Sequence, residues 1–207
     1  MNDAEIPEWL GGIVAGARNP HNWHSSAEEL KRASDLLRST WFAEVLSQHE
    51  RFQAYMAGEL ARPWEPWVGG PAMTLAAFAI ENVLKGLLIA SNPALVQPSM
   101  DQPEILFGAA IRSHNLLRLA DDAGVDLSHE EKTLLERLTE FAQWAGRYRF
   151  PVRARDAAPR PGAEGGGSSF TSDWFPTLDA FFTRLLDDLE DAGRQLDRQR
   201  ELSALSE

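Results

Sequence analysis

The sequence contains no cysteine among its 207 residues. This absence excludes a disulfide framework, a thiolate nucleophile and a cysteine-based zinc site. The Gly-x-x-x-x-Gly-Lys-Ser/Thr and Gly-x-Ser-x-Gly motifs are missing too, so neither a P-loop enzyme nor a serine hydrolase of the nucleophile-elbow type is indicated. The five histidines form no His-x-x-x-His or His-Glu-x-x-His group. We therefore expect no bound metal and no cofactor.

Signals for a membrane or for export are also scarce. Residues 1–12 lack a basic stretch followed by an apolar one, so no secretory signal is expected. The longest apolar stretch, residues 76–90, is interrupted by three polar residues, which argues against a membrane span. We expect a cytoplasmic protein with no membrane partner. Hydrophobic residues make up 43% of the chain and charged residues 25%, which is ordinary for a folded domain with a real core.

The chain has no excess of positive charge. Its formal net charge of −11 disfavours a partner held by phosphate attraction over the whole surface. Residues 147–160 are an exception, with five arginines against the single acid Asp156. This basic segment is either a solvated loop or a local patch for an anionic partner.

Apolar residues recur at helical spacing through most of the chain, and no alternating strand pattern of useful length is present. We expect an all-α protein, built as an up-and-down bundle of four to five core helices with an N-terminal arm and a long C-terminal helix. The expected organisation is an arm over 1–24, a bundle core over 25–151, a flexible Arg/Gly/Pro-rich loop over 152–172, and the C-terminal helix over 173–207.

Capping residues suggest where several helices begin. Ser25 or Ser26, each followed three residues later by glutamate, predicts the start of the first core helix, and Ser128 with Glu131 predicts the start of a later one. The other expected segments are a weaker helix over 48–61, a central helix over 71–90, a connector over 92–112, a short helix over 114–123 and a final helix over 175–202.

The central helix carries Glu81, Asn82 and Lys85 among otherwise apolar residues. At 100° per residue, Glu81 and Lys85 lie on one stripe of the helix and Asn82 lies at its edge. Burying such groups is tolerable only when each finds a partner. The alternative is an exposed ion pair on one solvated face, which would stabilise the helix by only ~0.3–0.5 kcal/mol.

Three further polar residues stand at the ends of neighbouring helices. His114 begins the short helix, where a neutral imidazole is favoured, and Arg147 with Tyr148 ends the helix after it. Each also has a plain structural interpretation, as a capping or packing histidine and as a charge at a helix C-terminus. Our hypothesis is that one binding site gathers all six polar residues, namely Glu81, Asn82, Lys85, His114, Arg147 and Tyr148.

Three motifs together resemble the HEPN superfamily. They are Glu81-Asn82-x-x-Lys85 in an apolar helix, Ser-His-Asn-Leu-Leu-x-Leu-Ala over 113–120, and Leu-Glu-Arg-Leu-Thr-Glu-Phe-x-x-Trp-Ala-Gly-Arg-Tyr over 135–148. The resemblance covers residues 26–151. It implies a four- or five-helix bundle of a prokaryotic defence, toxin–antitoxin or nucleotidyltransferase-linked system. Active members are metal-independent endoribonucleases with an Arg-x4-6-His motif, and they usually act as dimers.

This chain departs from the family motif, because no histidine follows Arg147 at the required spacing. The only formal match, Arg18 to His24, lies in the expected arm. Three functions therefore stay open. The first is a non-catalytic module that binds a nucleotide, an RNA or a partner protein. The second is an endoribonuclease toxin with a rewired site, in which His114 is the acid/base and Arg147 stabilises charge. The third is a structural dimerisation protein. The resemblance also implies a homodimer.

Overall fold

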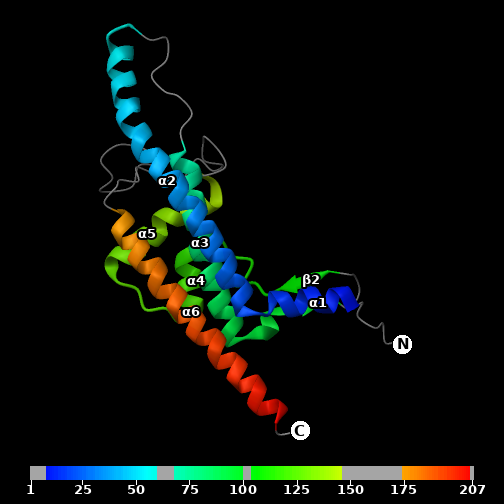
Figure 1. Cartoon of the computed structure of the whole chain (residues 1–207). Coiled ribbons are helices and arrows are strands. Elements are labelled where there is room, and N and C mark those ends of the chain that lie inside the picture. Colours follow the sequence, from blue (N-terminus) through cyan, green and yellow to red (C-terminus); the bar gives the residue numbers. More distant parts are fainter. Residues whose placement is uncertain (1–7, 60–67, 100–103, 146–173, 206–207) are drawn as a thin grey trace.

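The computed structural model describes residues 8–59, 68–99, 104–145 and 174–205, and these form an all-α helical bundle with one small hairpin (Figure 1). The described elements are α1 (Glu8–Ala17), α2 (Pro20–Met56), α3 (Gly69–Ser91), a 3-10 turn (Pro93–Leu95), β1 (Val96–Pro98), β2 (Ile105–Phe107), α4 (Leu116–Asp122), α5 (His129–Glu140), a π-helical turn (Phe141–Ala145) and α6 (Trp174–Ala204). Figure 1 shows α2 extending past the body at one end and α6 at the other.

Helix α2 is longer than the sequence predicts at both ends. Its N-cap is Asn19, whose side chain accepts a hydrogen bond from the His21 N–H, and Pro20 occupies the first helical position, which suits proline. The predicted start at Ser25 or Ser26 is therefore wrong. A separate helix over 48–61 is wrong as well, because α2 continues to Met56. Gly58 follows its end with φ of 79°, a conformation that glycine adopts freely.

The expected N-terminal arm contains helix α1. Leu10 and Val14 are buried, and α1 packs on β1. The expected arm contains two tryptophans, Trp9 and Trp23, which differ in burial. Trp23 packs against the core, and its indole N–H donates to the Ala17 carbonyl at 2.9 Å, whereas Trp9 is 56% exposed. Only one of the two therefore docks on the body.

A two-stranded hairpin lies within the expected connector, where no strand was predicted. Strands β1 and β2 are antiparallel, with Val96 opposite Phe107 and Pro98 opposite Ile105. Each strand has three residues, which is too short for an alternating pattern to stand out. At the end of β2, the Gly108 N–H donates to the Leu95 carbonyl, and a Cβ at Gly108 would lie only 2.9 Å from a Leu95 methyl carbon.

The caps of α4 and α5 are local and well formed. The Asn115 side chain accepts from the Arg118 N–H, so α4 begins at Leu116 and the predicted start at His114 is wrong by two residues. The prediction at Ser128 is confirmed, because Ser128 and Glu131 form a reciprocal capping box. His114 consequently lies in the segment before α4, outside the helix.

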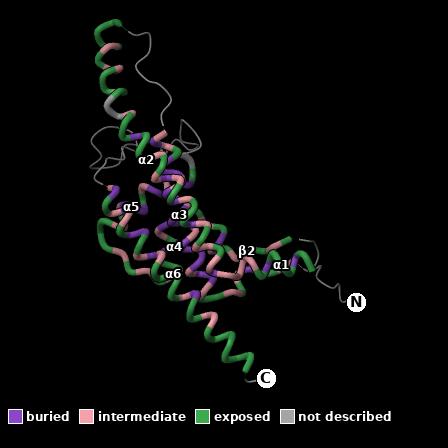
Figure 2. Tube along the Cα trace, viewed as in Figure 1, coloured by how far each residue is buried: buried purple, intermediate pink, exposed green. Residues whose placement is uncertain are grey.

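Helix α3 is the centre of the bundle, with α2, α4, α5 and α6 packed around it. Buried residues concentrate on α3 and on the faces turned toward it (Figure 2). Among the described helices, α3 alone is long and apolar enough to cross a membrane by length and composition, and 78% of its most apolar window is buried inside the bundle. This enclosure is the environment of a core helix.

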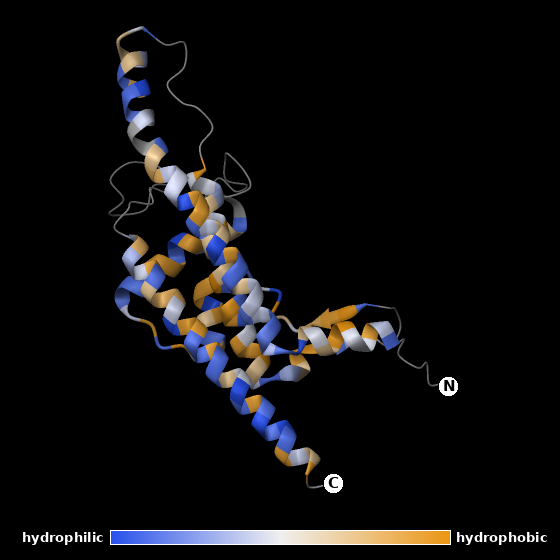
Figure 3. Ribbon diagram, viewed as in Figure 1, coloured by the Kyte–Doolittle hydropathy of each residue, from blue (hydrophilic) through white to orange (hydrophobic). Residues whose placement is uncertain are grey.

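Unlike the buried α3, a position on α2 and the end of α6 are exposed. Leu36 shares the helical spacing of other apolar residues of α2, yet it is 65% exposed. The last turns of α6 are exposed and mostly hydrophilic (Figure 3). The body therefore buries the first two thirds of α6 and leaves its end in solvent.

Candidate functional site

The polar stripe of α3 is buried. Glu81 is 5% exposed and Lys85 is 7% exposed, and the Lys85 Nζ donates to the Glu81 Oε1 at 2.6 Å. Four residues of helix separate the two side chains, with the acid N-terminal to the base, which is the favourable order. The alternative of an exposed pair on a solvated face is therefore wrong. Each ion is tolerated at this depth because the other compensates it.

His114 joins this pair from the segment before α4. Its Nδ1 lies 3.0 Å from both carboxylate oxygens of Glu81, and its side chain is 50% exposed. An ionised carboxylate only accepts hydrogen bonds, so these contacts require the proton on Nδ1. In the neutral imidazole, the other ring nitrogen, Nε2, then carries a lone pair. The structure thus brings together three of the six predicted site residues, namely Glu81, Lys85 and His114, and we call them the His114 cluster.

Asn82 belongs to a different contact. Its side-chain nitrogen donates to the Ser26 hydroxyl at 3.0 Å, which ties α3 to α2. The structure does not bring Asn82 into the His114 cluster, so its predicted place in the binding site is wrong. Arg147, Tyr148 and the basic segment over 147–160 lie outside the described residues. Their convergence on the site stays a prediction.

The segment that carries His114 is held by three hydrogen bonds around the start of α4. The Ser113 hydroxyl accepts from the Asn115 N–H at 3.1 Å, and the Asn115 side chain accepts from the Arg118 N–H. The third bond comes from another helix. The Leu116 N–H donates to the Thr139 hydroxyl of α5 at 3.1 Å. Thr139 could not be predicted as a site residue, because nothing in the sequence distinguishes it from other helical threonines.

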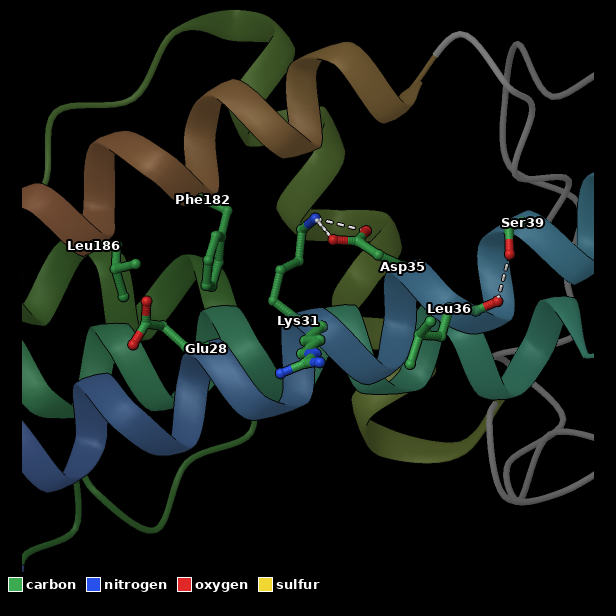
Figure 4. Close-up of a pocket in the computed structure, with 8 residues that line it drawn as sticks. Glu28, Lys31, Asp35, Leu36, Ser39, Phe182 and Leu186 are labelled. Atoms are coloured by element: carbon green, nitrogen blue, oxygen red, sulfur yellow. Dashed lines mark hydrogen bonds and ion pairs between the residues drawn. The ribbon is translucent and has the colours of Figure 1, made fainter.

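A second feature is a groove of about 490 Å³ between α2 and α6 (Figure 4). Lys31 reaches into it with a buried ammonium, which contacts the Asp35 carboxylate at 2.7 Å and Asp179 at 2.8 Å. Arg38 binds Asp179 through both carboxylate oxygens, at 3.0 and 2.9 Å. Two cations and two carboxylates therefore neutralise one another here. Phe182 and Leu186 supply the apolar wall.

This network holds α2 against α6 and responds to acid. Partial burial raises the pKa of the Asp179 carboxyl, whereas the hydrogen bonds and positive charges of Lys31 and Arg38 lower it by more. The pKa of Asp179 therefore lies below its ordinary value. A carboxyl with a lowered folded-state pKa stabilises the fold fully above its unfolded pKa of about 4. That stabilisation is lost as the pH falls through the folded-state pKa.

We expect Asp179→Asn to lower the free energy of unfolding by about 1–2 kcal/mol at pH 7, because the amide leaves Lys31 and Arg38 with weaker partners. The difference from wild type should narrow below pH ~4 and vanish once Asp179 is protonated. Urea unfolding at a series of pH values measures it. Asp187→Asn, an exposed site on the same helix, is the control and should change little. A difference in the free energy of unfolding that stays constant down to pH 2 would contradict a lowered pKa for Asp179.

The described residues contain no group of three or more histidine, aspartate or glutamate side chains arranged to hold a metal ion. The chemistry open to the His114 cluster is that of its own groups, a carboxylate, an ammonium and an imidazole. Comparison with protein-family models, with curated proteins and with solved structures finds no match for this chain.

Proposed function

We propose that the chain is a HEPN-like helical module that binds RNA or a nucleotide at the His114 cluster, in a defence or toxin–antitoxin setting. One observation carries the proposal. It is a half-exposed imidazole whose Nδ1 is held by both oxygens of a buried carboxylate. The helical architecture and the motif resemblance support the family, and the cluster supports a site.

A purely structural role explains the cluster less well. Glu81 and Lys85 lie on the same helix and compensate each other's charge, so their burial does not require a third group. His114 adds a polar ring that is half open to solvent and buries little apolar area. An ordered imidazole with a free Nε2 is suited to accept a hydrogen bond from a hydroxyl or, when protonated, to donate one to a phosphate. RNA offers both groups.

The same geometry favours one second candidate, a metal-independent endoribonuclease. A carboxylate that fixes Nδ1–H leaves Nε2 as the base, and this is how a carboxylate orients the histidine of a catalytic triad. At an RNA 2′-hydroxyl, Nε2 would take up the proton as the oxygen attacks the adjacent phosphorus. The bond from that phosphorus to the 5′-oxygen of the next nucleotide breaks, and the leaving oxygen takes a proton from water. In this candidate Arg147 stabilises the developing charge, and the chain uses His114 in place of the missing motif histidine.

We expect His114→Ala to weaken RNA binding by about tenfold or more, because it removes a hydrogen bond to a charged group. Fluorescence anisotropy with a labelled single-stranded RNA in EDTA measures the dissociation constant. His129→Ala is a matched control, since His129 is an exposed histidine at the start of α5. AMP and ATP competition tests the nucleotide form of the ligand.

The same samples separate the candidates when run on a denaturing gel. Binding without cleavage supports the non-catalytic module, whereas EDTA-resistant cleavage that His114→Ala abolishes supports the endoribonuclease. If wild type and His114→Ala bind RNA and nucleotides equally poorly, both candidates are wrong and the dimerisation role is left.

A further inference from the structure

We infer that Thr139 is a positioning residue for His114: its hydroxyl, presented by α5, fixes the start of α4 and thereby holds the imidazole on Glu81. The inference rests on the proposed function for the role of His114, while its structural content concerns only where the imidazole is held. The two hydrogen bonds of the Thr139 hydroxyl go to Leu116 and Leu135, not to Glu81 or His114, so Thr139 acts through the backbone between them.

The position of His114 depends on a short tether. The residue lies before α4, in a segment that belongs to no helix or strand, and no helical hydrogen bonds fix its backbone. Leu116 follows two residues later, so its Cα lies within about 7.6 Å of the His114 Cα along the chain. The Leu116 side chain is fully buried in the core. Anything that shifts Leu116 therefore shifts His114.

The backbone of Leu116 is held by the Thr139 hydroxyl. The first N–H groups of a helix have no partner within the helix and need one from elsewhere. Asn115 supplies one for Arg118, and Thr139 supplies one for Leu116, at 3.1 Å. The Thr139 hydroxyl also donates to the Leu135 carbonyl at 2.7 Å. Its single proton is thereby committed, which leaves its oxygen lone pairs to accept from Leu116.

A neighbouring threonine offers a matched comparison. Thr133, also on α5, donates to the His129 carbonyl at 3.0 Å in the same intrahelical pattern. Within the part of the chain that the structure describes, its hydroxyl makes no hydrogen bond to α4. Thr133→Val and Thr139→Val therefore remove the same type of helical bond, and only Thr139→Val also removes the link to the His114 segment.

The test reads the imidazole directly. Nitrogen NMR of the histidine rings reports which nitrogen carries the proton, and wild type should show His114 with its proton on Nδ1. In Thr139→Val we expect this preference to be lost, together with a three- to tenfold rise in the RNA dissociation constant. Thr139→Ser keeps the hydroxyl and should restore both readouts. Thr133→Val should leave both at wild-type values.

The outcomes separate the two proposals. If the Thr139→Val protein keeps the proton of His114 on Nδ1, the proposed role of Thr139 is wrong, whether or not the RNA dissociation constant changes. If Thr139→Val shifts the proton of the His114 ring and wild type does not bind RNA, the positioning role is supported and the proposed RNA function is wrong. Hydrogen exchange at the Leu116 amide of wild type covers the case in which Thr139→Val does not fold. Slow exchange supports the bond, and exchange at the rate of an exposed amide overturns it.

Discussion

Glu81→Leu is expected to lower the free energy of unfolding by about 3–5 kcal/mol, because it leaves the Lys85 ammonium buried without its partner. Lys85 is only 7% exposed, so its ammonium has little access to water in the folded state. Urea unfolding, followed by far-UV circular dichroism, measures the change. A loss of this size would be a large share of the stability of an ordinary domain.

The double variant Glu81→Leu with Lys85→Leu should regain most of that loss, because apolar residues of similar size can replace a buried ion pair at little cost. It should fold, yet leave His114 without its carboxylate and bind RNA no better than His114→Ala. The control is Asp122→Ala, which removes another acid from an intrahelical pair, the exposed one with Arg118. It should cost less than about 1 kcal/mol. Equal losses for Glu81→Leu and Asp122→Ala would contradict the burial of the cluster.

Gly86→Ala is expected to lower the free energy of unfolding by about 1–3 kcal/mol through overpacking. Gly86 lies where α3 passes both α6 and α2. An added Cβ would come within 2.8 Å of a Leu189 methyl carbon and 2.9 Å of the Trp23 Cβ. The leucine methyl could rotate away, but the Trp23 Cβ is attached directly to the backbone of α2 and moves only with the helix.

The matched control for this substitution is Gly70→Ala, in the first turn of the same helix. Nothing lies within 4 Å of a Cβ built there, so alanine should stabilise α3 by up to about 1 kcal/mol through its higher helix propensity. The two substitutions are chemically identical and should have opposite signs. Thermal unfolding of both variants tests this, and a stabilised Gly86→Ala protein would contradict the close approach of the three helices.

Local signals explain which parts of the fold could be predicted. The central helix was expected over 71–90 and spans Gly69–Ser91. This prediction is close because the apolar run and the Asn-Pro that follows it are local signals, which do not depend on how the helices pack. The start of α2 was misplaced because several caps compete in one stretch, and Asn19 with Pro20 prevails over Ser25 and Ser26. The exposure of Leu36 could not be predicted, because helical spacing does not reveal where α6 will lie.

In the candidate site, too, some contacts follow from local sequence and others depend on how the helices pack. Glu81 and Lys85 could be paired from the sequence, since four residues of helix place them together. The contact of His114 with Glu81 bears out only the part of the hypothesis that joins these two residues with Lys85. Asn82 turns to α2 because its place at the edge of the stripe faces Ser26, which depends on how the helices pack. Thr139 and Thr133 look alike in sequence, and only the position of α4 gives one of them a second partner.

The enclosure of α3 has a consequence for synthesis of the protein. Helix α6, which covers part of α3, is the last described helix to be translated, and the two are far apart in sequence. At a rate of about 5–20 residues per second, several seconds pass between the completion of α3 and the start of α6. During this time α3 can pack against α2, which precedes it, but the face that α6 covers in the folded protein is without its partner helix. Nascent chains of this protein should therefore depend on chaperones more than its modest size suggests.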